Sequence, residues 1–187
     1  MDVSGAKSAF LGGQADGIGC WNTIALSIED EGCVKAASAA DGSILASGMV
    51  ATDKALENKF DEVKIFFEVF VKAQDYFAEH RDEYAAYMYE TCVEEGVSCT
   101  EDTAERLIET YAYLPSETVI SNACNEIEDG KGTAGRMISQ TEADLLVMLD
   151  FFIEQGSYTE ENRSYILDNG CVDSSIAEAA AADFGLN

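Results

Sequence analysis

The sequence is short of histidine, proline and tryptophan, with one of each among its 187 residues. Because His80 is the only histidine and no two cysteines are spaced C-x-x-C, we expect no zinc site and no other metal. The chain also lacks a G-x-S-x-G motif and a histidine–carboxylate pair at ligand spacing. We therefore expect no catalytic residue and no cofactor, and we interpret His80 as a solvated side chain at a polar helix end.

Basic residues and long apolar runs are also scarce. The chain has 11 lysines and arginines against 36 aspartates and glutamates, which gives a formal net charge of −25. Such a charge repels nucleic acid and anionic membrane surfaces, so neither is an expected partner. No run approaches the roughly 18 apolar residues of a membrane span, and the first residues lack the basic and apolar segments of a signal peptide. With 47% hydrophobic residues the chain can nevertheless bury a core.

Six cysteines are present, an even number that permits disulfides in several pairings. The best local candidate is the pair Cys92 and Cys99, because the residues between them are typical of a helix end, a glycine cap and a turn. Closing so short a loop would contribute about 2–3 kcal/mol in the chain-entropy model. The alternative is that the six cysteines are reduced, half-buried thiols.

The only tryptophan lies in a segment with the pattern of a binding site. A helix predicted over residues 4–11 ends at paired glycines, and a short buried strand is predicted over residues 16–20. Trp21 follows this strand, and a polar turn after it leads into a helix predicted over residues 24–31. In open α/β sheets, ligands bind beyond the carboxyl ends of strands, where helix N-termini offer free N–H groups.

This pattern makes Cys20, Trp21 and Asn22 candidate ligand-binding residues. Trp21 offers a flat face for stacking, and Asn22 or Thr23 is expected to cap the following helix. The alternative interpretation is that Trp21 is an ordinary core aromatic at a strand end.

Two further strands are predicted, over residues 33–37 and within the apolar run 43–51, which contains Gly48. The chain then becomes strongly helical. Helices are predicted over residues 61–79, 81–94, 101–113, 140–155 and 157–169, and from residue 175 onward. Residues 125–135 are interpreted as an acidic surface loop, because the spacing of a phosphate-binding loop is absent.

Several local signals define these helices. Thr100 is expected to cap the helix that follows it, and Ser139 with Glu142 forms the spacing of a capping box. Pro115, the only proline, is expected to break the helix before it. In the helix over residues 61–79, apolar side chains at helical spacing predict a stripe that faces the core. The members of this stripe are Val63, Phe66, Phe67, Phe70, Ala73 and Phe77.

Four stretches, taken in order, resemble the C-terminal part of a known family. They are G-Q-A-D at 13–16 followed by Trp21, S-G-M-V-A-T at 47–52, F-V-K-A-Q-D-Y at 70–76 with H-R-D-E-Y-A at 80–85, and D-F-F-I-E-Q-G at 150–156. The family is that of the substrate-binding proteins of ABC importers, of the type that binds nitrate, sulfonates, taurine and thiamine-pyrimidine precursors. Each stretch is short, and the resemblance rests on their order and spacing.

The resemblance implies an α/β fold, namely part of a two-lobe periplasmic-binding-protein type II fold with a helix-rich C-terminal region. Residues 1–45 would end the second lobe, residues 46–52 would cross between the lobes, and residues 53–187 would return to the first lobe. The signal peptide and most of the first lobe would then precede Met1. Unpaired strand edges in such a fragment would favour self-association.

The implied function is that of an extracytoplasmic, lipid-anchored solute-binding protein that delivers its ligand to an ABC permease. A small organic or anionic solute would bind in the cleft between the lobes, against Cys20, Trp21 and Asn22, with Ser47 and Gly48 near the crossover. Two alternatives remain: a sensory or interaction domain on the same fold, and an enzyme similar to thiamine-pyrimidine synthase.

Overall fold

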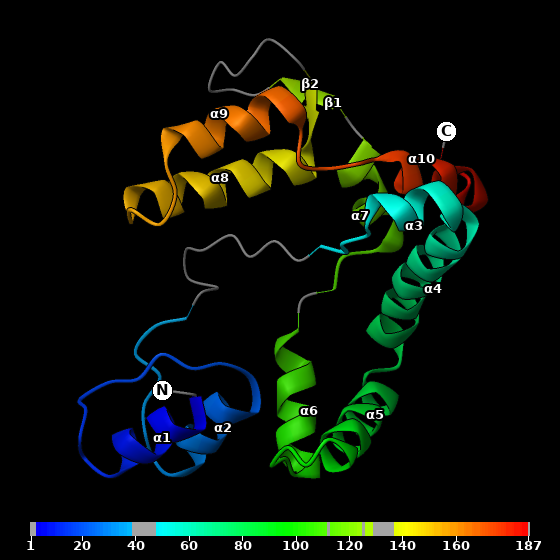
Figure 1. Ribbon diagram of the computed structural model, residues 1–187. Helices are drawn as coiled ribbons and strands as arrows, with labels where there is room; N and C mark the ends of the chain where they lie inside the picture. Colours follow the sequence, from blue (N-terminus) through cyan, green and yellow to red (C-terminus); the bar gives the residue numbers. More distant parts are fainter. Residues whose placement is uncertain (1–2, 39–47, 112, 125, 129–136, 187) are drawn as a thin grey trace. The chain divides into compact units, whose positions relative to one another are not determined.

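The computed structural model describes residues 3–38, 48–111, 113–124, 126–128 and 137–186. The described part of the chain is helix-rich. The helices are α1 (Val3–Leu11), α2 (Asn22–Asp30), α3 (Asp53–Asn58), α4 (Phe60–Glu79), α5 (Arg81–Glu94), α6 (Glu101–Thr110), α7 (Ser116–Cys124), α8 (Gln140–Glu154), α9 (Glu160–Asn169) and α10 (Ser175–Ala181), followed by the 3₁₀ turn η2 (Ala182–Phe184) (Figure 1).

Within the described residues, the only sheet is a hairpin of two short strands. β1 (Glu126–Glu128) pairs antiparallel with β2 (Met137–Ser139), with Ile127 opposite Ile138. The strands predicted over residues 16–20 and 33–37 are wrong, because both segments are irregular. Gly17 and Gly19 leave the first segment little side-chain surface to bury in a sheet. In the second, Val34 is 91% exposed.

The chain divides into two compact units. The first unit contains Met1–Ser38 and Tyr76–Tyr113, and the second contains Ala39–Asp75 and Leu114–Asn187. In the first unit, α6 packs against both α5 and α2, and α1 packs against α2. Buried side chains of this unit lie on these helices: Ile28, Ala85, Cys92, Ala104, Leu107 and Ile108.

The core of the second unit forms where α8 meets β2 and α9. Ile138, Leu146, Leu149 and Leu167 are buried against one another there. Figure 1 shows α9 lying alongside α8, and α7 packs on both α8 and α10. In the same unit, Lys64 of α4 forms an ion pair with Asp183 of the C-terminal turn η2.

Two helix starts follow the capping signals predicted from the sequence. The side chains of Thr100 and Ser139 each accept a hydrogen bond from the backbone N–H three residues later, at 3.1 Å, as predicted. Helix α7 is not among the helices expected from the sequence, where Pro115 signals only the break of the preceding helix. A proline just before a helix, with Glu117 in the first turn, is also a start signal.

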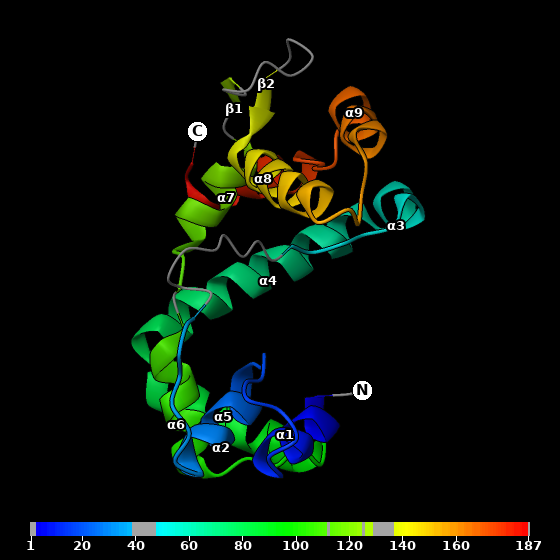
Figure 2. The same ribbon diagram turned by 90° about the vertical axis from the view of Figure 1, so that its left-hand side faces the viewer.

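Helix α4 forms as predicted, but its aromatic stripe is not all core. Phe66 and Phe70 are exposed, whereas Val71 is fully buried. The helix carries apolar residues around most of its circumference, and only the face toward its neighbours within the unit is covered. Figure 2 shows α4 running on from the short α3. In the described part of the chain, none of the helices has the length and apolar character needed to cross a bilayer.

Candidate functional site

Trp21 stands at the entrance of α2 and is largely open to solvent. It is the N-cap residue of this helix, in an extended conformation, and its indole is 62% exposed. The interpretation of Trp21 as a core aromatic is therefore wrong. The expectation that Asn22 or Thr23 caps the helix is also wrong, because both lie inside α2. Cys20, immediately before Trp21, is half-buried.

The first turn of α2 receives no side-chain cap, because an indole has no hydrogen-bond acceptor to offer its N–H groups. The N-terminus of a helix carries partial positive charge, which favours an anion or a carbonyl oxygen nearby. An exposed aromatic face and an uncapped helix N-terminus thus lie next to each other at Trp21. This pairing suits a small solute with a flat or apolar part and a negatively charged end.

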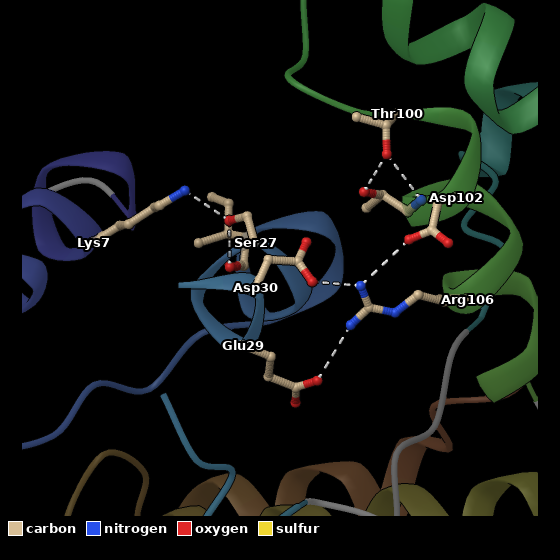
Figure 3. A network of polar contacts seen from close by, with 9 residues as sticks. Lys7, Ser27, Glu29, Asp30, Thr100, Asp102 and Arg106 are labelled. Atoms are coloured by element: carbon tan, nitrogen blue, oxygen red, sulfur yellow. Dashed lines mark hydrogen bonds and ion pairs between the residues drawn. The ribbon is translucent and has the colours of Figure 1, made fainter. Parts of the chain in front are cut away.

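A polar network fixes the other end of α2 (Figure 3). Glu29 and Asp30 lie at the C-terminus of the helix, where negative charge opposes the helix dipole. Arg106 of α6 bridges them, with N–O distances of 3.6 Å to Glu29 and 2.5 Å to Asp30, and also lies 3.5 Å from Asp102. The hydrogen bond to Asp30 raises the pKa of Arg106 further above its usual value. The guanidinium of Arg106 therefore contacts three carboxylates, partly neutralises their charge and joins α2 to α6.

A second contact ties α2 to α1. Lys7 donates to the hydroxyl of Ser27 at 2.8 Å, and Ser27 donates in turn to the carbonyl of Ile24 at 2.7 Å (Figure 3). Helix α2 is therefore held on two sides by polar contacts. These contacts with α1 and α6 position helix α2, and with it Trp21 at the start of the helix.

The two remaining predicted binding residues, Ser47 and Gly48, are not tested as neighbours of Trp21. Ser47 lies outside the described residues. Gly48 is exposed in an irregular segment of the second unit, whereas Trp21 belongs to the first. A common site formed by Ser47, Gly48 and Trp21 therefore stays a prediction.

The second unit contains a small pocket that the sequence did not indicate. Its volume is about 150 Å³. The pocket is lined by residues of α7, β2, α8, α10 and the segment before α10: Ala123, Cys124, Met137, Ile138, Ser139, Glu142, Val172, Ser174 and Glu178. These residues are far apart in the sequence and carry no shared motif, so no local pattern could have predicted their meeting.

The chemistry of this pocket is polar and acidic, and its thiol is not activated. Burial and the nearby carboxylate of Glu178 raise the pKa of the Cys124 thiol, which lowers the thiolate population at neutral pH. Ser174 donates to a carboxylate oxygen of Glu178 at 2.5 Å. Among the described residues, no group of three or more histidine, cysteine or acidic side chains is placed to hold a metal ion. With its raised pKa, the Cys124 thiol of this pocket is mostly protonated at neutral pH.

Cys92 and Cys99 meet at the closed end of the α5–α6 hairpin. Both are free thiols in the structure, and they share a hydrogen bond. Burial and, secondarily, this hydrogen bond raise the pKa of Cys99 to about 11. The disulfide between them stays a prediction.

In the reduced protein, we expect Cys99 to react slowly with iodoacetamide. At pH 8 its thiolate population is about 200-fold smaller than that of an ordinary thiol with a pKa near 8.5. The greater nucleophilicity of a high-pKa thiolate offsets roughly tenfold of this difference, so alkylation should be roughly 10- to 30-fold slower than that of a cysteine in an unstructured peptide. Because the pKa is raised, the rate should keep increasing up to about pH 11. Peptide mass spectrometry after timed quenching measures it.

A Cys92→Ser variant is the matched control, because it removes the neighbouring thiol and leaves the loop length unchanged. It should speed the alkylation of Cys99 only modestly, since burial is the larger cause of the raised pKa. Equal rates at pH 8 for Cys99 and for a cysteine in an unstructured peptide would show that the Cys99 thiol is not shielded. Linked peptides in a non-reduced digest would establish the disulfide.

Comparison with known proteins found no family model, no curated protein and no solved structure that matches the chain.

Proposed function

We propose that this chain is a non-catalytic solute-binding protein and that the solute binds at Trp21. In the form that the family resemblance implies, it is the C-terminal part of the extracytoplasmic, lipid-anchored substrate-binding component of an ABC importer. Its fold would be part of the two-lobe periplasmic-binding-protein type II fold. Its partner would be the membrane permease of that importer, and its ligand a small organic or anionic solute.

One observation carries this proposal: the only tryptophan is exposed at the uncapped N-terminus of α2. Removing the apolar face of an exposed tryptophan from water is favourable in free energy. A flat solute that stacks on the indole does this. The N–H groups of the first turn would then receive the anionic or carbonyl end of the same solute. The bridge from Arg106 to the far end of α2 keeps this arrangement in place without a ligand.

Trp21→Ala should weaken binding of the true solute by roughly 5- to 150-fold, because stacking on an aromatic contributes about 1–3 kcal/mol. The ligand is first found by a thermal-shift and tryptophan-fluorescence screen of the whole chain against nitrate, taurine, thiamine-pyrimidine precursors and amino acids. Isothermal titration calorimetry then measures the affinity of each variant. Since Trp21 is 62% exposed, the free energy of unfolding should change by less than about 1 kcal/mol.

Two variants serve as controls for this experiment. Trp21→Phe keeps an aromatic face and should retain most of the affinity. Tyr165→Ala removes a similarly exposed aromatic from α9 in the second unit and should leave the affinity unchanged. If a solute binds without altering the emission of Trp21, and Trp21→Ala retains full affinity, the site at α2 is wrong.

A second candidate function is an interaction domain. The observation that favours it is the exposed apolar face of α4, which is independent of Trp21. A solute screen without any hit, combined with a protein or peptide ligand that binds at α4, would select this alternative.

A further inference from the structure

Four large apolar side chains form one exposed stripe on α4 within the second unit. Ile65, Phe66, Val69 and Phe70 are each between 47% and 63% exposed. Their spacing places them on two successive turns of the same helix face. Isolated exposed apolar residues are ordinary, but several large ones together typically mark an interaction surface. We refer to these four residues as the α4 stripe.

The contacts of the neighbouring residues explain why the α4 stripe stays open. The opposite side of the helix carries the fully buried Val71. Lys64 forms ion pairs with Glu68 and Asp183, so this side of α4 is fixed against the C-terminal turn η2. Because the helix is already anchored there, it does not rotate to bury the stripe within its own unit.

The exposed charges at the N-terminal end of the α4 stripe are mainly acidic, because two carboxylates outnumber Lys59, which lies just before the helix. Asp61 and Glu62 are exposed at its N-terminal end. The two lysines of the helix are engaged elsewhere: Lys64 in its ion pairs, and Lys72 above the ring of Phe184 at 4.8 Å. A partner that binds the α4 stripe therefore contacts an apolar surface with exposed carboxylates beside it.

This charge pattern selects among the possible partners. A second copy of the chain would bring another formal charge of −25 against the first, which opposes self-association through this face. A helix with one apolar face and basic flanking residues matches both features, since its apolar side chains cover the stripe while its lysines and arginines face Asp61 and Glu62. Attraction between opposite charges also speeds its association.

We propose that the α4 stripe is a docking surface for a basic amphipathic helix of another protein. The helix packs its apolar face against Ile65, Phe66, Val69 and Phe70, and its basic residues pair with the surrounding carboxylates. This surface is separate from the solute site at Trp21, and neither proposal requires the other.

The test uses a fluorescently labelled 18-residue peptide of leucine and lysine, patterned as an amphipathic helix, added to the whole chain. Its affinity, measured by fluorescence anisotropy, should fall at least roughly tenfold in the double variant Phe66→Ser/Phe70→Ser. Neither substitution changes the charge, so general attraction of the basic peptide to the acidic protein is the same in both proteins. Added salt should weaken the binding to the unaltered chain.

Three controls make the result specific. Phe151→Ser removes a comparably exposed phenylalanine from α8 and should change the affinity less than about twofold. Trp21→Ala should leave peptide binding unchanged, which separates this surface from the solute site. A peptide with glutamate in place of every lysine should not bind. If the double variant fails to fold, Val69→Asn places an uncharged polar group in the same stripe and should also weaken the binding.

Peptide affinity that is equal in the unaltered chain and in the α4 variants would overturn the proposal, because the attraction would then be purely electrostatic. So would an equal loss with Phe151→Ser. Sedimentation equilibrium provides the remaining test: a dimer that dissociates in the double variant would assign the stripe to a second copy of the chain instead.

Discussion

Replacing Ile108 with alanine is expected to lower the free energy of unfolding by about 2–5 kcal/mol, the usual range for this change in a packed core. Ile108 lies on α6, the helix that packs against both α5 and α2, and only 1% of its surface is exposed. Truncation removes buried apolar surface and leaves a cavity that fixed helices fill incompletely. Urea denaturation followed by the fluorescence of Trp21, which lies in the same unit, measures the loss.

The matched control is Ile65→Ala on α4, which makes the same change at a side chain that is 58% exposed. It should alter the free energy of unfolding by less than about 1 kcal/mol. A similar loss for both variants would mean that burial does not distinguish the two positions. No loss for Ile108→Ala would mean that α6 is not the centre of the first unit.

The helices of this protein could be predicted well where a local signal exists. Thr100 and Ser139 are placed where a helix needs an acceptor for its first N–H groups, and such a signal depends only on a few neighbouring residues. The strands were not predictable in the same way. A strand is stabilised by a partner that is distant in sequence, so apolar runs such as residues 33–37 looked like strands although nothing pairs with them.

For helix α4, the sequence predicts the helix but not which of its faces is buried. Its periodicity predicts a helix, but apolar residues lie on more than one of its faces. Which face is buried depends on contacts such as that between Lys64 and Asp183, which are 119 residues apart. The sequence therefore could not reveal that Phe66 and Phe70 are exposed, and their interpretation as core residues was wrong.

For the candidate sites too, only the features that depend on neighbouring residues could be predicted from the sequence. Trp21 could be singled out because it is unique and precedes a helix, and both features are local. The pocket around Cys124 and Glu178 could not, because it is assembled by the packing of α7, β2, α8 and α10.

The largest single polar contribution is expected from Asp75, which caps α7 from a neighbouring helix. Both donors of Ser116 point at its carboxylate, the backbone N–H at 2.8 Å and the hydroxyl at 2.5 Å. Ser116 is buried and is the first residue of α7. The negative charge also lies at the positive end of the α7 dipole. The carboxylate thus supplies the acceptor that the helix start lacks in its own sequence, where Pro115 precedes it.

Asp75→Ala should lower the free energy of unfolding by about 2–4 kcal/mol, because both donors of the buried Ser116 lose a charged acceptor. Asp75→Asn keeps one acceptor oxygen and should lose about 1 kcal/mol. Glu79→Ala, which removes an exposed carboxylate from the same helix, should be neutral or slightly stabilising in a chain of net charge −25. Urea denaturation followed by circular dichroism measures all three, and a double-mutant cycle with Ser116→Ala isolates the coupling between the two side chains. If Asp75→Ala is as mild as Glu79→Ala, the carboxylate does not cap α7, and this helix start is held by its apolar contacts alone.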